Sequence, residues 1–154
     1  MRLTQFTDYS LRVALYLAEN PGRACSVREI AEWFGISRDH LVKVAHNLAR
    51  LGFIVSAKGR GGGLRLARPA ADITLAELVK ATEADFHTVE CFDVARNTCR
   101  IARGCRLKHV LGDATRAFLT ALEGKTLASV AAPSLSFTAH QKEPSRESSR
   151  EISL

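Results

Sequence analysis

Three cysteines that lie close together are the residues of this chain best suited to do chemistry. The segment "CFDVARNTCRIARGC" holds Cys91, Cys99 and Cys105, separated by seven and then five residues. Arginines lie between and beside them, and positive charge stabilises both thiolates and a negatively charged cluster. Three thiols neither pair completely into disulfides nor fill a tetrahedral metal site. The spacing is compatible with an iron–sulfur cluster, with zinc, or with redox thiols that bind no metal. A metal site would need one further ligand from elsewhere.

Two residues outside the spacing pattern carry groups that bind metals. His109 lies four residues after Cys105, on the same helical face, and is either a ligand or a surface histidine. Asp8 falls in the first turn of a predicted helix, where the helix dipole favours an acid in any case. The fourth cysteine, Cys25, stands apart and is expected to be a small buried apolar residue.

The charge distribution points to a nucleic-acid partner. The chain has 154 residues, a length that suits one domain with appendages, and a net charge of +6. Residues 1–70 hold 11 Lys and Arg against 5 Asp and Glu, whereas residues 71–132 hold 8 of each. All of the positive excess therefore lies in the first half. No signal segment or membrane-length apolar run is found, so we expect a cytoplasmic protein with no membrane partner, in which clustered cysteines bind metal more often than they form disulfides.

The basic half has the pattern of a helix-turn-helix followed by a wing. Thr7 is expected to cap the first helix, the Ser26–Glu29 capping box opens a second, and a third runs over 37–51 from Ser37 as its cap. Gly35 stops the second helix, which leaves a short turn before the third. Strands over 53–58 and 64–68 flank "GRGGG", which is a turn signal. These glycines run from strand to strand and lack a Gly-Lys-Ser/Thr ending, which argues against a phosphate loop.

The helix over 37–51 is the expected recognition helix. Winged helices also serve as protein-interaction modules, but the basic excess favours DNA. A recognition helix places its N-terminal residues against base edges and phosphates in the major groove. Wing residues reach the adjacent backbone, and an arginine there can enter a narrow minor groove. The predicted DNA-binding residues are Ser37, Arg38, His40, Lys43, Lys58 and Arg60.

The second half is predicted to be helical around the cysteine segment. A short helix follows Thr74, which with Glu77 is expected to form a second capping box, and a long amphipathic helix covers 107–122. The apolar stripe of the long helix is broader than one domain needs, which indicates a second copy as its partner. We therefore predict a mainly α fold with a small β-hairpin wing, in which residues 1–70 form the winged helix-turn-helix, 71–132 the cluster-binding loop and dimerisation helix, and 133–154 a disordered tail.

These features together resemble the iron–sulfur winged-helix family of transcriptional regulators. The resemblance runs over "MRLTQFTDYSLRVALYLA", "IAEWFGISRDHLVKVAHNLARLGFIVSAKGRGGGLRLAR", "ITLAELVKATE" and the three cysteines, and thus over residues 1 to about 131. Within the family, the opening "MRLTQFTDYSLR" and the surroundings of the cysteines are most similar to the nitric-oxide-sensing repressors.

The resemblance implies a homodimer with a cluster in each subunit. Its ligands are implied to be Cys91, Cys99 and Cys105 of one subunit and Asp8 of the other, and the cluster is implied to be 4Fe-4S, with 2Fe-2S as the alternative. Other members have a histidine three residues after the last cysteine. Here that position is Lys108, which argues against His109 as a ligand.

The function that follows is transcriptional repression without enzymatic activity. We expect the protein to bind a palindromic operator in double-stranded DNA and to release it when nitric oxide attacks the cluster. Two alternatives are a related regulator that senses iron–sulfur status or redox state, and an iron–sulfur electron carrier. The last requires a substrate pocket or a second cofactor motif, and the sequence shows neither a nucleophile elbow nor a dinucleotide fingerprint.

Overall fold

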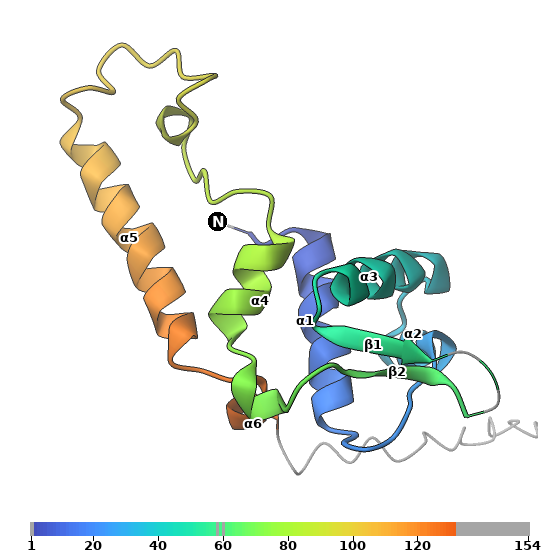
Figure 1. Ribbon diagram of the computed structural model, residues 1–154. Coiled ribbons are helices and arrows are strands. Elements are labelled where there is room, and N and C mark those ends of the chain that lie inside the picture. Colours follow the sequence, from blue (N-terminus) through green and yellow to red (C-terminus); the bar gives the residue numbers. More distant parts are fainter. Residues whose placement is uncertain (1, 58, 60, 132–154) are drawn as a thin grey trace, which may run out of the picture.

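The winged helix-turn-helix and the long helix are both present in the computed structural model, which describes residues 2–57, 59 and 61–131 (Figure 1). Lys58, Arg60 and the predicted tail lie outside the described residues. The helices are α1 (Gln5–Ala18), α2 (Val27–Phe34), α3 (Arg38–Arg50), α4 (Leu75–Thr82), α5 (Arg106–Glu123) and α6 (Leu127–Val130), with 3-10 turns η1 (Ala70–Asp72) and η2 (Glu90–Phe92). The predicted fold class is confirmed: the chain is mainly helical with one antiparallel hairpin.

The hairpin is shorter than the sequence predicted. Strand β1 covers Ile54–Ala57 and β2 covers Gly63–Leu66, so the residues at 53, 67 and 68 lie outside the assigned strands. Ile54 pairs with Leu66 and Ala57 with Gly63, which leaves the glycine-rich turn between the strands. The hydrogen bonding continues one step further, because the Ala67 amide donates to the Phe53 carbonyl at 2.9 Å.

The helix starts confirm some capping predictions and correct others. Ser26 and Glu29 form the predicted capping box, and Gly35 ends α2 in a left-handed conformation, with φ 63°. The prediction that Thr7 caps α1 is wrong. Thr4 is the cap, and its hydroxyl accepts the Thr7 amide at 3.2 Å, while Thr7 is fully buried.

Two further caps are weaker than predicted. Ser37 occupies the cap position of α3, but its hydroxyl makes no capping hydrogen bond. Thr74 accepts from the Glu77 amide as expected, while the Glu77 carboxylate pairs with Arg68 rather than returning to the cap. The guanidinium of Arg68 brings a full positive charge and several N–H donors, whereas the cap offers the carboxylate one amide.

Helix α1 lies in the centre of the core. It packs against α3, α4, α6 and β2, and its buried residues Val13, Ala14 and Leu17 face these elements. Figure 1 shows α4 between α1 and α5, so the long helix stands apart from the winged helix. None of the helices in the described ranges has the length and apolar character needed to cross a membrane.

The start of β2, next to the glycine-rich turn, is joined to the residue before the cap of α2 by a two-bond backbone bridge. The Cys25 amide donates to the Leu64 carbonyl at 3.0 Å, and the Leu64 amide donates to the Cys25 carbonyl at 2.8 Å. Cys25 is completely buried there, as the sequence predicted. Gly63 has φ 152°, and a Cβ at this position would lie 2.8 Å from the Cys25 carbonyl oxygen. Only glycine permits this close approach.

A network of polar side chains joins α1, α2 and the loop between them. The Glu29 carboxylate accepts from the Tyr16 hydroxyl at 2.7 Å and from the Arg23 guanidinium at 2.5 Å. Burial, and then the bond to Glu29, raise the pKa of Tyr16 to about 12. Partial burial raises the pKa of Glu29, but the bonds from Arg23 and Tyr16 outweigh it and the net pKa is lowered.

This network makes the stability of the domain depend on pH. Because the folded pKa of Glu29 is lowered, its contribution is present above the unfolded value of about 4.3 and is lost as the pH falls through the folded pKa. We expect Glu29→Gln to lower the free energy of unfolding by roughly 1–2 kcal/mol at pH 7. Urea unfolding at pH 7 and at pH 3 measures this, and the difference between wild type and variant should shrink at pH 3.

The matched control is Glu32→Gln, one turn later on the same helix. Its partner is Arg28 at 3.7 Å, and both side chains are largely exposed, so we expect a change below about 0.5 kcal/mol. Equal losses in the two variants at both pH values would contradict the assignment to the Tyr16–Glu29–Arg23 network.

Candidate nucleic-acid interface and metal-binding segment

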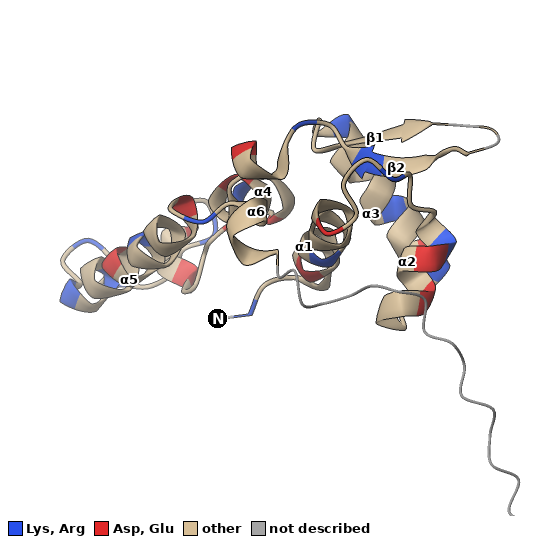
Figure 2. Ribbon diagram, turned by 90° about the horizontal axis from the view of Figure 1, so that it is seen from below, with Lys and Arg blue, Asp and Glu red and all other residues tan. Residues whose placement is uncertain are grey.

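Helix α3 presents a continuous polar face to solvent. Its inner side is buried through Leu41, Val44, Ala45 and Leu48. On the opposite side, exposed residues recur at spacings of four, three and four, and they are Asp39, Lys43, His46 and Arg50. Figure 2 shows basic segments on α3 and on the neighbouring hairpin. A helix with one buried and one polar, mainly basic face can enter a DNA groove without exposing the core.

The structure brings four of the six predicted DNA-binding residues together. Ser37, Arg38, His40 and Lys43 are all exposed and all lie within the first two turns of α3. Lys58 and Arg60 lie outside the described residues, so the wing contribution stays a prediction.

Sequence reasoning passed over three exposed residues of the same helix. His46 and Arg50 continue the outer face toward its C-terminal end, and the side chain of Val42 is 46% exposed beside them. The signal was available, because residues at i+3 and i+4 from Lys43 and His46 share one face of a helix. The prediction named only the N-terminal residues of the helix, because these contact base edges in helix-turn-helix proteins.

The three clustered cysteines lie on the segment that joins α4 to α5. Cys91 is in η2, Cys99 has no regular secondary structure, and Cys105 is the N-cap residue of α5. All three are free thiols. Figure 1 shows the segment projecting beyond the ends of α4 and α5, away from the wing. Within the described part of the chain, no three Cys, His, Asp or Glu side chains are close enough together to hold a metal ion.

The donor groups nevertheless fit an iron–sulfur cluster chemically. Thiolate is the usual ligand of cluster iron, and none of the three thiols is consumed in a disulfide. Cys105 stands at the N-terminus of an 18-residue helix and makes no capping bond with its side chain. The partial positive charge of that helix end favours a thiolate or an anionic group. The segment is also rich in arginine, with Arg96, Arg100 and Arg103 all exposed.

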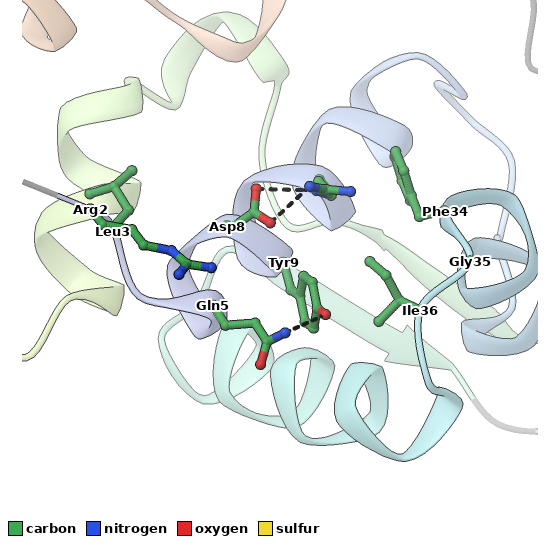
Figure 3. Close-up of a pocket in the computed structure, with 9 residues that line it drawn as sticks. Arg2, Leu3, Gln5, Asp8, Tyr9, Phe34, Gly35 and Ile36 are labelled. Atoms are coloured by element: carbon green, nitrogen blue, oxygen red, sulfur yellow. Dashed lines mark hydrogen bonds and ion pairs between the residues drawn. The ribbon is translucent and has the colours of Figure 1, made fainter.

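Asp8 faces a solvent-open hollow between α1 and the helix-turn-helix turn. The hollow has a volume of about 570 Å³ and is lined by Arg2, Leu3, Gln5, Asp8, Tyr9, Arg12, Phe34, Gly35 and Ile36 (Figure 3). The Asp8 carboxylate binds Arg12 through two bonds, of 2.9 and 3.1 Å. The Arg12 guanidinium lies 5.8 Å above the centre of the Phe34 ring. Asp8 is thus connected through one side chain to the end of α2.

The neighbours of Asp8 reach both the recognition helix and the cysteine segment. The ring of Tyr9 lies 6.4 Å from that of His40 on α3, and the Tyr9 hydroxyl accepts from Gln5 at 2.8 Å. At the start of α1, the Thr4 amide donates to the carboxylate of Glu83 at 2.6 Å. Glu83 is the C-cap residue of α4, where the cysteine segment begins. The first turns of α1 and its cap therefore contact the end of α2, helix α3 and the end of α4.

The long helix α5 has no buried residue in the single chain. Its exposed apolar positions recur at spacings of three and four, and they are Leu107, Val110, Ala114, Ala117 and Ala121. Leu107 is 62% exposed and Val110 is 61% exposed. Helix α5 packs against α4, and its half-buried apolar residues at 111, 118, 119 and 122 lie on another side of the helix. We call the five exposed positions the α5 stripe.

Comparison with known proteins identifies the family. Residues 3–133 match the model of Rrf2, described as an iron-dependent transcriptional regulator. The chain is 48% identical over 128 residues to the HTH-type transcriptional regulator NsrR of Bacillus subtilis (strain 168), covering 82% of this chain and 88% of that protein. NsrR of Shouchella clausii (strain KSM-K16) is also 48% identical, with 82% and 86% covered.

Solved structures agree at the level of the fold. CymR, the global cysteine regulator of B. subtilis, superposes with a TM-score of 0.69 at 21% identity, covering 85% of this chain and 96% of that one. IscR of T. potens gives a TM-score of 0.68 at 23% identity, with 84% and 85% covered. The match to the family model covers nearly all of the described chain, and the predicted absence of enzymatic activity agrees with it. The chain belongs to the Rrf2 family of transcriptional regulators.

Proposed function

We propose that this protein is a transcriptional repressor that senses nitric oxide through an iron–sulfur cluster and releases its operator when the cluster reacts. The observation that carries the proposal is the presence of three free thiols on one exposed segment, next to a complete winged helix-turn-helix. The NsrR relatives support it, because they share 42–48% identity over 82% of this chain. We also propose that it acts in the cytoplasm, where thiols stay reduced.

The proposed cluster ligands are Cys91, Cys99 and Cys105 of one subunit and Asp8 of the other. We propose a 4Fe-4S cluster, with 2Fe-2S as the alternative. When bound, the cluster supplies iron that reacts with nitric oxide. A carboxylate is a harder ligand than a thiolate, so it binds cluster iron less strongly and is displaced more easily. Asp8 would therefore be the ligand that leaves.

In the cluster-free chain, Arg12 holds the Asp8 carboxylate. The two side chains are 43% and 45% exposed, and an ion pair of that exposure contributes about 0–1 kcal/mol. Asp8 can therefore leave Arg12 and bind cluster iron at little cost in free energy. Because Arg12 also lies over Phe34, the exchange changes a contact between α1 and the helix-turn-helix turn.

The consequence for DNA binding follows from the placement of α3. Dimeric helix-turn-helix proteins need their recognition helices about 34–36 Å apart to reach adjacent half-sites. A change at α1 reaches α3 through the Tyr9–His40 contact and the shared core. A coupling of about 1–3 kcal/mol changes affinity roughly 5–150-fold, which is enough to switch repression.

A regulator that senses iron–sulfur status or redox state instead would use the same fold and ligands. It would lose its operator on cluster loss or oxidation and would respond weakly to nitric oxide. Membership in a family of transcriptional regulators disfavours the other alternative, an iron–sulfur electron carrier.

The decisive experiment is a nitric oxide titration of the anaerobically purified full chain. Bound iron and sulfide, and release of an operator found by in vitro selection, are measured together. We expect release at nitric oxide concentrations comparable to that of the cluster. Cys99→Ser should bind no cluster, whereas Cys25→Ala should keep both cluster and response, because Cys25 is buried far along the chain from the segment.

The same titration examines Asp8. Asp8→Ala should retain the three thiolate ligands and hence the cluster, while its operator affinity falls by roughly 5–150-fold. A colourless, zinc-loaded protein that binds its operator and ignores nitric oxide would contradict the proposal. Unchanged operator affinity in Asp8→Ala would remove Asp8 from the coupling.

We propose that Ser37, Arg38, His40 and Lys43 contact DNA in the major groove, together with Lys58 and Arg60 of the wing. Lysine acts as a point charge and suits a backbone phosphate. We expect Lys43→Ala to weaken binding to all DNA sequences alike and to lower the slope of log affinity against log salt by about 1. Fluorescence anisotropy at several salt concentrations measures this slope.

Lys125→Ala is the matched control, because Lys125 is an exposed lysine beyond the end of α5 and remote from α3. Its salt slope should equal that of wild type. An unchanged slope in Lys43→Ala would contradict a phosphate contact, and a loss confined to one base pair would assign Lys43 to a base edge.

We propose that the α5 stripe pairs with the same stripe of a second copy to form the repressor dimer. Charged residues are depleted from the centres of such interfaces. Val110→Glu should therefore convert the dimer to a monomer in sedimentation experiments and abolish binding to the palindromic operator. Thr120→Glu, on the exposed polar side of α5, should leave the dimer intact. Equal sedimentation of both variants would contradict the pairing.

A further inference from the structure

The cysteine segment is held together almost entirely by short-range bonds. Between residues 84 and 105, the described hydrogen bonds join residues two or three apart, such as the Cys99 amide with the Asn97 side chain at 3.0 Å. The exception is a pair of bonds to Glu90. Bonds between near neighbours do not fix the distance between the two ends of a segment. The bonds to Glu90 therefore determine which parts of the segment are held close together.

Glu90 accepts two hydrogen bonds from Thr98, eight residues later. The Thr98 amide donates at 2.5 Å and the Thr98 hydroxyl at 2.7 Å, both to the same carboxylate oxygen. These bonds lower the pKa of Glu90, so the side chain is a charged acceptor at neutral pH. We call this pair of bonds the Glu90–Thr98 clasp.

The clasp joins the direct chain neighbours of two cysteines. Glu90 precedes Cys91, and Thr98 precedes Cys99. Phe92, within the loop closed by the clasp, lies beside α5, since a Cβ added to Gly112 of that helix would lie 3.9 Å from the end of the Phe92 ring. Helix α5 is also the helix that Cys105 begins.

We propose that Glu90 is a positioning residue that holds Cys91 and Cys99 at the same end of a closed loop before any cluster binds. The inference rests on the proposed function. Without the clasp, the two thiols would be separated by a flexible stretch whose closure costs entropy. With the clasp, part of that cost is met before the cluster arrives, and preorganised ligands bind more tightly for this reason.

The first test measures the effective concentration of the two thiols in the cluster-free full chain. Cys105→Ser leaves Cys91 and Cys99 as the only pair, since Cys25 is fully buried. In a glutathione redox buffer, the pair passes two electrons and two protons to glutathione disulfide, which forms one protein S–S bond and two glutathione thiols. The equilibrium constant reports how close the two thiols are held.

We expect Glu90→Ala to lower this constant roughly three- to tenfold, because two bonds to a charged acceptor are lost in an exposed setting. Glu90→Gln keeps a side-chain carbonyl that can accept both bonds and should stay within about twofold of the parent chain. Asp85→Ala is the matched control and should have no effect, since Asp85 interacts with the nearby His87, through its amide at 2.9 Å and its ring Nδ1 at 3.8 Å.

A second measurement follows the loss of iron to a chelator from the anaerobically reconstituted full chain with all cysteines present. Loss should be faster for Glu90→Ala and near the wild-type rate for Glu90→Gln. If Gln and Ala behave alike in both measurements, the charge rather than the geometry of Glu90 matters and the proposal is overturned. An unchanged thiol equilibrium in Glu90→Ala also overturns it.

Failure of the clasp and failure of the proposed function remain distinguishable. If the wild-type chain binds no iron and sulfide, the proposed function fails, yet the thiol equilibrium still reports on the clasp. If wild type and Glu90→Ala carry equally stable clusters and equal thiol equilibria, the clasp fails while cluster sensing stands.

Discussion

The position of α1 is the constraint on which the rest of the structure depends. This helix packs against four elements of the core: the recognition helix, the wing, α4 and α6. Even its polar residues Thr7 and Ser10 are fully buried. Close-packed interiors do not deform gradually. A force applied to the first turns of α1 therefore reaches α3 as a movement of packed elements rather than being absorbed between them.

Two parts of the molecule are stabilised in different ways. The winged helix-turn-helix is held by buried apolar contacts and by the network around Glu29. The cysteine segment, over 84–105, has no buried residue and is held by exposed bonds, of which the Glu90–Thr98 clasp is an example. The Asp8–Arg12 pair at the start of α1 is partly exposed as well. Exposed charged bonds exchange partners readily, and a regulator needs that property where its signal arrives.

Much of the fold could be read from local sequence, because local rules decide it. The Ser26–Glu29 capping box, the left-handed Gly35 and the periodicity of α3 and α5 involve residues at most a few positions apart. The start of α1 was misjudged because the choice of Thr4 over Thr7 depends on packing, and the Thr4 amide meets Glu83, 79 residues away.

The sequence indicated candidate residues for the site but not their contacts. The cysteines and the basic end of α3 stand out by residue type and spacing, whereas Asp8 was implied only by the family resemblance. The contacts of Arg12 with Phe34 and of Tyr9 with His40 join different helices, and no periodicity encodes them. Glu90 was overlooked because its partner is partly a backbone amide, which every residue except proline supplies.

The bridge between Cys25 and Leu64 affects how the winged helix-turn-helix unfolds. Cys25 directly precedes the cap of α2, and Leu64 lies in β2, so the wing and the helix-turn-helix share one buried joint. Elements joined in this way open as one cooperative unit. The amides of both residues should then exchange with solvent only when the whole domain unfolds. Heat or denaturant would remove groove and wing contacts in a single step, which leaves no half-bound form of the repressor.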